Sequence, residues 1–451
     1  STSEPKPIVF TQRTKIIRSL AAQTLYGITE NDITLTPTPL YHSISQRLVL
    51  MPLITGGTCV IMRNFTTKGW FEMIQQYKIT FCTYEDKLSK IFKGLPSEAY
   101  TDDDFWIKEG KTVFSDNWMF VGFVHELNSV GDAITLTVAN QPILILKNSE
   151  NKIVAFHNVC SHRCLKLVDK NKNLGKFISC PYHAWIYDLS GNLIRAPHFG
   201  GTNNHEPKGF KTKNNGLKSI RIKIWNDWIF INLNNNALPF EKYASPLIKQ
   251  LKEFNLKKIK PVATLDFGKI LTNWKFLIEN FIEPYHVQFV HRTTTSQPLK
   301  DHYTLVDGRC YGSAVDLKNE NTSADSLAVS SKYLSLFPNF IIGTYYPGQI
   351  GVHLNLPVEP GITHQKRIIY TTEGNNLTKN QIKGVKDLWW KVHKEDHEIC
   401  ERLQLGRSSP VSKKGGLLSP YWENSVRAFQ KIMIKSISKS KKIRKKVKND
   451  R

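Results

Sequence analysis

The spacing of apolar and polar residues divides the chain into three regions with different predicted secondary structure. In residues 1–85, stretches with helical spacing alternate with short apolar strands. Helices are predicted at 11–25, 48–53 and 68–77, and strands at 34–42 and 58–62, the first strand ending in a loop. Alternating helices and strands are typical of an α/β unit.

The second region, residues 95–235, has short apolar runs separated by turn-forming residues such as Asn148 and Asn151. Runs of this kind predict antiparallel strands. We expect such strands at 118–124, 133–138, 143–146 and 153–156, with more as far as residue 232.

The third region, residues 240–437, mixes both kinds of element, and a basic tail follows at 438–451. Helices are expected at 241–255, 274–290, 379–405 and 422–437, and strands at 340–345, 351–356 and 365–371. The predicted fold class is therefore α+β, with an N-terminal α/β piece, an antiparallel β domain and a larger mixed domain.

Composition agrees with a globular protein and excludes several other classes. The chain has 451 residues, of which 40% are hydrophobic and 22% charged. Extended disorder, collagen and a small disulfide-framed protein are excluded by these values. The seven cysteines are sparse and odd in number, as in a reducing compartment. No apolar run approaches the roughly 18 residues of a membrane span, and no signal pattern precedes residue 30. We expect a cytoplasmic protein, and the start at Ser1 indicates a fragment or a processed product.

The net charge of +24 points first to an anionic partner such as nucleic acid or a membrane surface. Much of the excess lies in the C-terminal residues 431–451, however, and such runs are usually solvated tails. No basic platform with interleaved aromatic residues supports a nucleic-acid binder. We therefore predict neither nucleic-acid binding nor a membrane span.

Residues 1–85 resemble part of the AMP-binding (acyl-CoA synthetase) superfamily. Ser1–Lys6 is similar to the back half of its phosphate loop, and Thr38–His42 and Gly56-Gly57-Thr58 fit the strands and turn that follow. The front of the loop, the adenylate-binding segments and the C-terminal lobe with its catalytic lysine have no counterpart. No adenylating activity is expected, and the residues leave open whether this piece folds or reflects a gene fusion or gene-model error.

The first candidate metal site has the spacing C-x-H-x17-C-x2-H. Cys160 and His162 stand on one predicted loop, and Cys180 and His183 stand on another. Two Cys and two His also suit a tetrahedral zinc, but zinc fingers usually place one residue type on each loop. One Cys and one His on each loop suit an asymmetric two-iron cluster with His on one iron, which is the Rieske arrangement.

The residues around these ligands resemble the Rieske domain of aromatic-ring-hydroxylating oxygenases. Arg163 follows the first His, and the second loop continues as Cys180-Pro-Tyr-His-Ala-Trp185. The family usually has Gly where Cys164 and Ala184 stand, so the fine loop geometry is open. Respiratory Rieske proteins carry a disulfide between the loops. Tyr182 occupies the place of the partner that Cys164 would need.

The second candidate metal site is the histidine pair His286 and His291, five residues apart in an apolar helical pattern. Pro284 removes a backbone donor and favours a local break that would bring the two rings together. With one carboxylate they would form a 2-His-1-carboxylate site, which leaves positions on Fe(II) for dioxygen and substrate. Two such histidines alone are more often core or surface residues, but the Rieske pattern favours a metal site.

Residues 279–291 resemble the catalytic domain of the Rieske non-haem iron oxygenases. The family motif has an acid three residues before the first His and a Tyr directly before it, and Glu283 and Tyr285 match. The third ligand is an Asp in a late helix, and Asp396 matches, with Glu395 and Glu398 as neighbouring competitors. The resemblance assigns catalytic roles to Glu283, Asn280 and Tyr285, and covers residues 95 to about 437.

This resemblance implies a helix-grip catalytic domain and a terminal oxygenase. A 2Fe–2S cluster held by Cys160, His162, Cys180 and His183 would pass electrons to Fe(II) held by His286, His291 and Asp396. In the family the cluster of one subunit lies near the iron of the next in a trimer. An acid bridges the two sites, and we assign it to Glu283, linking His183 and His286 across subunits. No dinucleotide-binding fingerprint is present, so electrons from NAD(P)H would arrive through a separate reductase or ferredoxin.

The sequence leaves the identity of the substrate open. It also does not decide whether the reaction is a hydroxylation or a demethylation, whether one or both oxygen atoms enter the product, or whether a beta subunit is present. The family's choline, betaine and carnitine monooxygenases also carry Glu at the bridging position, which favours a small quaternary ammonium substrate. An aromatic cage would suit that cation, and the catalytic half offers Phe337, Phe340, Tyr345, Tyr346, Trp389 and Trp390, although core packing is the more common role of such residues. The alternative is a Rieske electron carrier without oxygenase activity.

Overall fold

The structure is a computed structural model. It describes residues 11–37, 40, 43–63, 66–82, 92–295, 297–317, 329–346 and 348–449. The chain divides into two compact units, Ser1–Lys90 and Ile91–Arg451, and each is described by itself.

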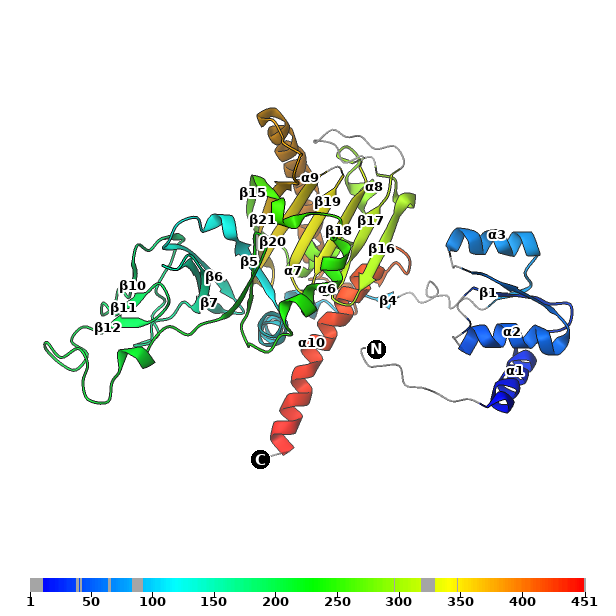
Figure 1. The fold of residues 1–451 in the computed structure, drawn as a ribbon, viewed down its shortest axis with the longest axis horizontal. Coiled ribbons are helices and arrows are strands. Elements are labelled where there is room, and N and C mark those ends of the chain that lie inside the picture. The colour runs from blue at the N-terminus through cyan, green and yellow to red at the C-terminus, as the bar shows by residue number, and fades with distance from the viewer. Residues whose placement is uncertain are drawn as a thin grey trace. The chain divides into compact units, whose positions relative to one another are not determined.

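The N-terminal unit is a small α/β fold, as the sequence pattern predicts. Its parallel strands lie in the order β2 (Thr58–Ile61), β1 (Ile33–Thr36), β3 (Phe81–Cys82). Helices α1 (Gln12–Tyr26) and α2 (Ser43–Thr55) lie on one face and α3 (Thr67–Tyr77) on the other (Figure 1). A core of Ala22, Ile28, Leu48 and Met51 holds the unit together. The phosphate-loop resemblance at Ser1–Lys6, and Thr38, Pro39, Tyr41 and His42, lie outside the described residues.

Short elements open the second unit and join it to the C-terminal part. They are β4 (Phe92–Lys93), α4 (Glu98–Thr101), α5 (Asp103–Glu109) and the π-helical turn η1 (Gly110–Phe114). Strand β4 pairs with β22 (Leu417–Leu418), which lies more than 300 residues later in the chain.

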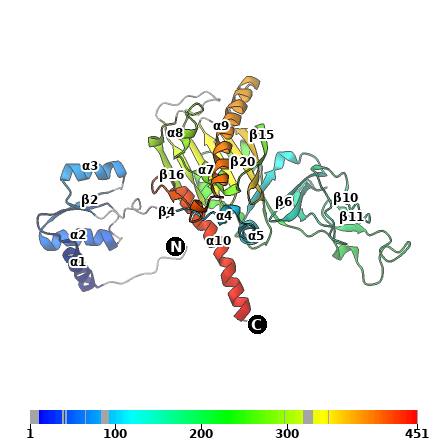
Figure 2. The ribbon, with the colours of Figure 1, turned by 180° about the vertical axis from the view of Figure 1, so that it is seen from behind.

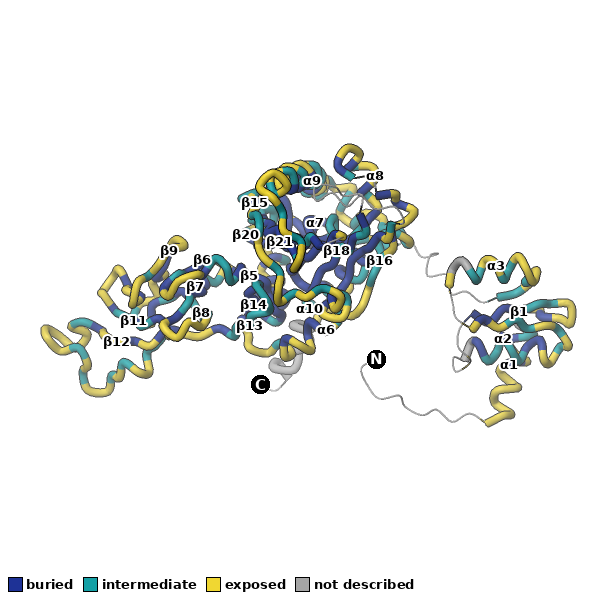
Figure 3. The backbone as a smooth tube through the Cα atoms, turned by 45° about the horizontal axis from the view of Figure 1, so that its top comes forward, coloured by how far each residue is buried: buried dark blue, intermediate teal, exposed yellow. Residues whose placement is uncertain are grey.

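Three small antiparallel sheets follow, built from the strands that the apolar runs predict. Their orders are β8-β7-β6-β9, β10-β11-β12 and β13-β14-β5. The strands are β5 (Met119–Phe123), β6 (Asp132–Val138), β7 (Gln141–Lys147), β8 (Ile153–His157), β9 (Lys172–Asn173), β10 (Phe177–Ser179), β11 (Ile186–Asp188), β12 (Leu193–Arg195), β13 (Arg221–Trp225) and β14 (Trp228–Asn232). The outer end, around β10 to β12, is largely exposed (Figure 3).

A seven-stranded antiparallel sheet in the order β15-β21-β20-β19-β18-β17-β16 forms the centre of the larger domain. The strands are β15 (Lys260–Ile270), β16 (His302–Asp307), β17 (Cys310–Val315), β18 (Ser331–Leu336), β19 (Phe340–Tyr345), β20 (Gln349–Glu359) and β21 (Ile362–Thr371). The helices are α6 (Phe240–Gln250), α7 (Trp274–Ile282), α8 (Val287–Val290), α9 (Lys379–Gly406) and α10 (Asn424–Asn449). Together with the small sheets this confirms the α+β fold class.

Side-chain alternation gives the large sheet two different faces. Phe340, Ile342, Val352 and their neighbours of the same parity pack against α6 and against β5 and β14. Ile341 and Tyr311 point the other way, into a core with α7 and α10 that continues into the first small sheets. Helices α7 and α9 lie on this second face (Figure 2). Polar side chains of the strands on this face therefore lie beneath helices and away from water.

Several elements differ from the sequence expectation. The helix expected at 274–290 is divided into two at the break that Pro284 favours, because Glu283 is extended (φ −112°, ψ 141°) before the proline. Strands β15 to β18 were not predicted, and in β15 the register shifts at 261/263 and 266/268 interrupt the period-two pattern. Helix α10 continues to Asn449 instead of ending at 437. The described helices include none with the length and apolar character that crossing a bilayer requires.

Candidate active site

Two loops at the outer end of the small sheets carry the first predicted metal site, and their backbones follow the same path. The N–H of Cys164 donates to the carbonyl of Cys160 at 3.0 Å, and that of Ala184 donates to Cys180 at 3.0 Å. Cys164 and Ala184 are both left-handed, at φ 57° and 52°. This conformation favours glycine, which explains the usual family residue. Cys164 and Ala184 keep this loop conformation without a glycine, at some cost in backbone strain.

The four predicted cluster ligands come together as a pair of thiols and a pair of imidazoles. Nδ1 of His162 lies 3.1 Å from Nδ1 of His183. Cys160 and Cys180 are buried, and Cys160 Sγ lies 3.2 Å from the hydroxyl of Tyr187. Burial raises the pKa of the Cys160 thiol. Two thiols on one side and two ring nitrogens on the other suit the two unlike irons of a Rieske cluster.

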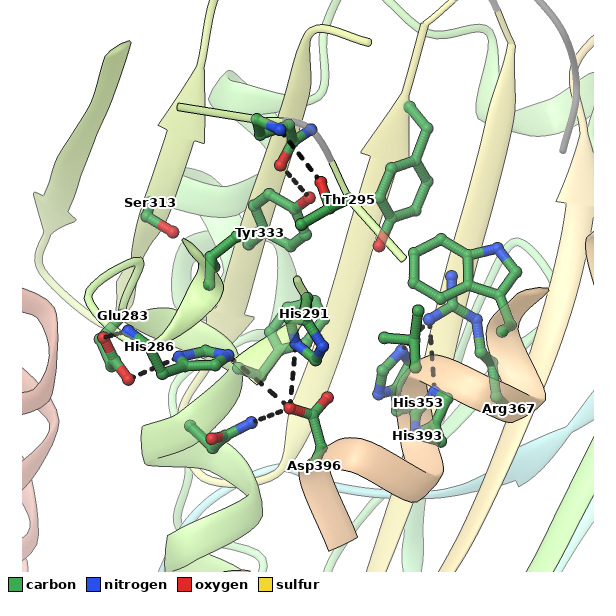
Figure 4. A pocket seen from close by; sticks show the side chains of 17 residues that line it. Glu283, His286, His291, Thr295, Ser313, Tyr333, His353, Arg367, His393 and Asp396 are labelled. Carbon is green, nitrogen blue, oxygen red and sulfur yellow. Dashed lines mark hydrogen bonds and ion pairs between the residues drawn. The ribbon is translucent and has the colours of Figure 1, made fainter. Parts of the chain in front are cut away.

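The second predicted metal site forms where the chain breaks between α7 and α8. The break places His286 just before α8 and His291 just after it, and both rings turn toward Asp396 on α9 (Figure 4). Nε2 of His286 lies 3.6 Å from Asp396 Oδ1, and Nε2 of His291 lies 3.1 Å from the same oxygen. The three ligand atoms lie within 4.8 Å of one another. A pair of imidazoles and one carboxylate at this spacing suits a divalent iron.

Each histidine of this group has its own acid on the opposite ring nitrogen. Nδ1 of His286 donates to Glu283 Oε1 at 2.6 Å, and Nδ1 of His291 donates to Glu395 Oε2 at 2.8 Å. Glu395 was a competitor for the ligand position, but its carboxylate lies behind His291. With both Nδ1 atoms protonated, both Nε2 atoms keep a lone pair for a metal.

The charges of the three groups reinforce one another. Burial raises the pKa of Asp396, but the positive charge of His291 and its hydrogen bond outweigh burial and lower that pKa to about 2. For His291 burial acts in the other direction and lowers the pKa, but the carboxylates of Asp396 and Glu395 outweigh it and raise that pKa to about 9. While no cation is bound, the carboxylates thus favour a proton on Nε2 of His291, and a metal ion bound there would displace that proton.

The other predicted catalytic residues take different positions. Nδ2 of Asn280 donates to Asp396 Oδ1 at 2.9 Å and so orients the carboxylate. Glu283 lines the pocket. The side chain of Tyr285 is 45% exposed and is not among the residues that line the pocket. Tyr285 is therefore placed at the surface beside the site.

The pocket above the three candidate ligands is lined by residues of the covered sheet face and of α9. The space between its lining atoms, with the open solvent at its mouth included, amounts to about 520 Å³. Of the six aromatic cage candidates, Tyr345 and Trp389 line it. Phe337 and Phe340 belong to the core, and Tyr346 and Trp390 are exposed.

Sequence reasoning missed several pocket residues. Ser313, Tyr333, His353 and Arg367 come from four strands, and His393 comes from α9. A charged residue in an apolar strand, such as Arg367 before Ile368-Ile369-Tyr370, was the available signal. The role of this charged residue could be recognised only from which face of the large sheet α9 covers.

Three family comparisons cover most of the chain. Residues 117–206 match the Rieske [2Fe-2S] domain, and residues 255–439 match the ring hydroxylating alpha subunit (catalytic domain). Residues 1–93 match the AMP-binding enzyme family, in line with the resemblance seen in the sequence.

Relatives of known function agree with these matches. Choline monooxygenase, chloroplastic, from Atriplex hortensis is 26% identical over 332 residues, covering 72% of this chain and 74% of that protein. The glycine betaine monooxygenase oxygenase subunit of Pseudomonas aeruginosa is 32% identical over 198 residues, or 44% of each chain.

Solved structures show the same fold. The quaternary ammonium Rieske monooxygenase CntA has a TM-score of 0.68 at 21% identity, covering 78% of this chain and 97% of that one. Naphthalene 1,2-dioxygenase from Rhodococcus sp. has a TM-score of 0.64 at 15% identity, covering 77% and 95%. The predicted family, enzyme class and pair of cofactors are thereby confirmed. The second unit of this chain therefore combines a Rieske 2Fe–2S domain with a ring-hydroxylating alpha-subunit catalytic domain, and a piece similar to AMP-binding enzymes precedes it.

Proposed function

We propose that His286, His291 and Asp396 hold the catalytic iron, and that Cys160, His162, Cys180 and His183 hold the Rieske cluster. The observation that carries the first assignment is the convergence of two Nε2 atoms and one carboxylate within 4.8 Å at the floor of a pocket. The paired imidazoles and buried thiols of the two loops support the second assignment.

When bound, the iron supplies dioxygen activation with electrons that the cluster passes to it. The chain's own residues prepare the site for this chemistry. Glu283 and Glu395 hold the Nδ1 protons of the two histidines and fix their tautomers. Asn280 fixes the Asp396 carboxylate. In the overall reaction one oxygen atom enters a C–H bond of the substrate, and the other leaves as water with two electrons and two protons.

Electron transfer between subunits of a homotrimer is part of the proposal. Within one chain the cluster loops beside β10 and β11 lie at one end of the second unit, and α7 and α8 lie toward the other (Figure 1). His183 is exposed, so a neighbouring subunit can reach it. We assign Glu283, which already holds His286, as the group that meets His183 of the next subunit. The CntA structure is described as revealing inter-subunit electron transfer in that protein.

A quaternary ammonium compound is the proposed substrate, and a reductase or ferredoxin that draws on NAD(P)H is the proposed electron donor. The names of the choline and glycine betaine monooxygenases support this substrate class. Oxidation of an N-methyl group would release formaldehyde, whereas oxidation elsewhere would leave an alcohol or its further oxidation product. Product analysis separates these two outcomes.

A cytoplasmic location is the final part of the proposal. None of the seven cysteines forms a disulfide, which agrees with a reducing compartment. The plant relatives are named as chloroplastic, so cell fractionation of the native source would test the location directly.

The decisive experiment combines metal analysis with oxygen-dependent turnover. The purified protein, reconstituted with iron and sulfide and supplied with a surrogate ferredoxin and reductase, is expected to hold about three iron atoms per chain. It is expected to consume oxygen in proportion to product formed from a trimethylammonium compound. About two iron atoms per chain and no product would favour the alternative of a pure electron carrier.

A further inference from the structure

A buried arginine lines the pocket on the side away from Glu283 (Figure 4). Arg367 extends from β21 and its side chain is fully buried. None of the described carboxylates forms an ion pair with it. A guanidinium in such a place is costly unless a negative group joins it.

Two of the three guanidinium nitrogens have no hydrogen-bond partner among the described residues. They are Nε and Nη2, and both are buried. The third, Nη1, donates to Nε2 of His353 at 2.9 Å and lies 3.4 Å from Nε2 of His393. Burial, followed by neighbouring positive charge, holds the pKa of both histidines well below the usual range. They are therefore neutral and accept from Nη1 without balancing its charge.

The surrounding residues are arranged to hold this side chain in place. The guanidinium carbon lies 3.4 Å from the centroid of the Trp389 ring, so the two planes are in contact. On the other side Gly351 supplies the room, since a Cβ there would lie 2.2 Å from Nη2 of Arg367. Gly351 pairs with Gly343 on β19, where a Cβ would lie 2.2 Å from the Tyr345 hydroxyl.

We infer that Arg367 binds a carboxylate of the substrate. Nε and Nη2 form one side of the planar guanidinium, and two parallel N–H groups on that side match the two oxygens of a carboxylate. The Tyr345 hydroxyl, which lies beside the Arg367 guanidinium, is a further donor at the same end of the pocket. The candidate iron ligands His286, His291 and Asp396 line the other end.

This inference rests on the proposed function and narrows it to a trimethylammonium compound that also carries a carboxylate. A molecule with both groups would place its trimethylammonium end toward the candidate iron site, where oxidation is proposed, and its carboxylate on Arg367. A trimethylammonium alcohol would leave Arg367 unpaired and add a second positive charge beside it. The Trp389 ring face that a cation would use is already taken by Arg367, so Trp389 acts in holding the arginine and not as a cage wall.

Binding of matched ligands to the holoenzyme tests the inference without turnover. We would titrate the oxidised, anaerobic protein with a trimethylammonium carboxylic acid and with its methyl ester, using calorimetry. The acid is expected to bind at least about tenfold more tightly than the ester, as one well-placed charged hydrogen-bond pair implies. In Arg367→Gln this preference should disappear, and in Arg402→Gln, an exposed arginine of α9, it should persist.

The wild-type comparison needs no variant, so it stands even if Arg367→Gln does not fold. Equal affinity for acid and ester in the wild type, or a preference that survives in a folded Arg367→Gln, overturns the inference. A carboxylic acid with a neutral tert-butyl group in place of the trimethylammonium group separates the two proposals. If it binds through Arg367 while no trimethylammonium compound is turned over, the proposed substrate class fails and the arginine site stands. If trimethylammonium alcohols and acids are turned over with equal kcat/KM, the proposed substrate class stands and the arginine site fails.

Discussion

The carboxylate of Glu395 lies 2.8 Å from Nδ1 of His291 and also accepts from the hydroxyl of Thr294 at 2.7 Å. Glu283 has the same relationship with His286. Both histidines therefore present Nε2 to the pocket, and each is held by an acid behind it. Glu395 directly precedes Asp396 in the sequence. One turn of α9 therefore supplies both a candidate iron ligand, Asp396, and the acid that holds another candidate ligand, His291.

Glu395→Gln is expected to weaken iron binding about 10- to 100-fold, because the amide is a poorer partner for the Nδ1 proton. Iron titration of the variant, followed by metal analysis after gel filtration, measures the affinity. The visible absorption of the Rieske cluster should stay unchanged. Glu398→Gln, an exposed position on the same helix, is the matched control. If Glu395→Gln binds iron as tightly as the wild type, Glu395 does not support the iron site.

Asp396→Ala is expected to lose the mononuclear iron and all oxygen-dependent product while keeping the cluster. The reason is that two imidazoles alone provide neither the third ligand nor the charge that a divalent iron needs. Iron content should fall from about three to about two atoms per chain. If the variant keeps full turnover, the assignment of Asp396 is wrong.

Mixed trimers test electron transfer between subunits. His183→Ala is expected to lack a working cluster and Asp396→Ala to lack the catalytic iron, so each homotrimer should be inactive. When the two variants are refolded or co-expressed together, some mixed trimers will place a subunit with an intact cluster next to a subunit with an intact iron site. These trimers should regain part of the activity. Product formation by the mixture, with each variant alone as control, is the measurement. Transfer within one chain would leave the mixture inactive.

The buried ion pair between Lys275 and Glu109 gives a stability prediction. Its Nζ–Oε1 distance is 2.6 Å, and the two side chains are 0% and 1% exposed. Lys275→Met should lower the free energy of unfolding by about 3–5 kcal/mol, because Glu109 would lose its counter-charge and keep only the indole N–H of Trp274, 3.4 Å away, as a partner. Lys275→Met combined with Glu109→Gln should recover much of the loss. Urea unfolding followed by fluorescence measures the cycle. A double variant as unstable as Lys275→Met alone would contradict this explanation.

Glu423, at the start of α10, gives a prediction about pH. Burial, together with the negative charges of Glu283 and Glu279, raises its pKa to about 7. Its pKa is thus higher in the folded chain than in the unfolded chain. The stability that its protonated form contributes is therefore present below about pH 4 and is lost as the pH rises through about 7. Glu423→Gln should show a smaller fall in Tm between these values. Parallel pH profiles of variant and wild type would contradict this.

Several elements were predictable because their signals are local. The strands near 119–123, 141–147 and 340–345 and helix α9 follow from apolar periodicity within a few residues. The break at Pro284 follows from the missing N–H of proline. Strand β15 was not predictable in this way, since its bulges are set by pairing with β21, which lies about 100 residues later.

The sequence by itself determined which residues have metal-ligand chemistry. The Cys-x-His and Cys-x2-His loops and the pair His286 and His291 are close in the chain, so their spacing constrains their geometry. Asp396 was identified by family resemblance, and the tertiary structure brings it next to His291.

Only the tertiary structure decided the roles of residues that meet across the fold. Glu395 changed from a competing ligand to the acid behind His291, and Arg367 became a candidate carboxylate site once α9 was seen to cover it. The physical reason is that hydrogen bonding and burial depend on which sheet face a helix covers. That choice is made by packing between segments far apart in sequence.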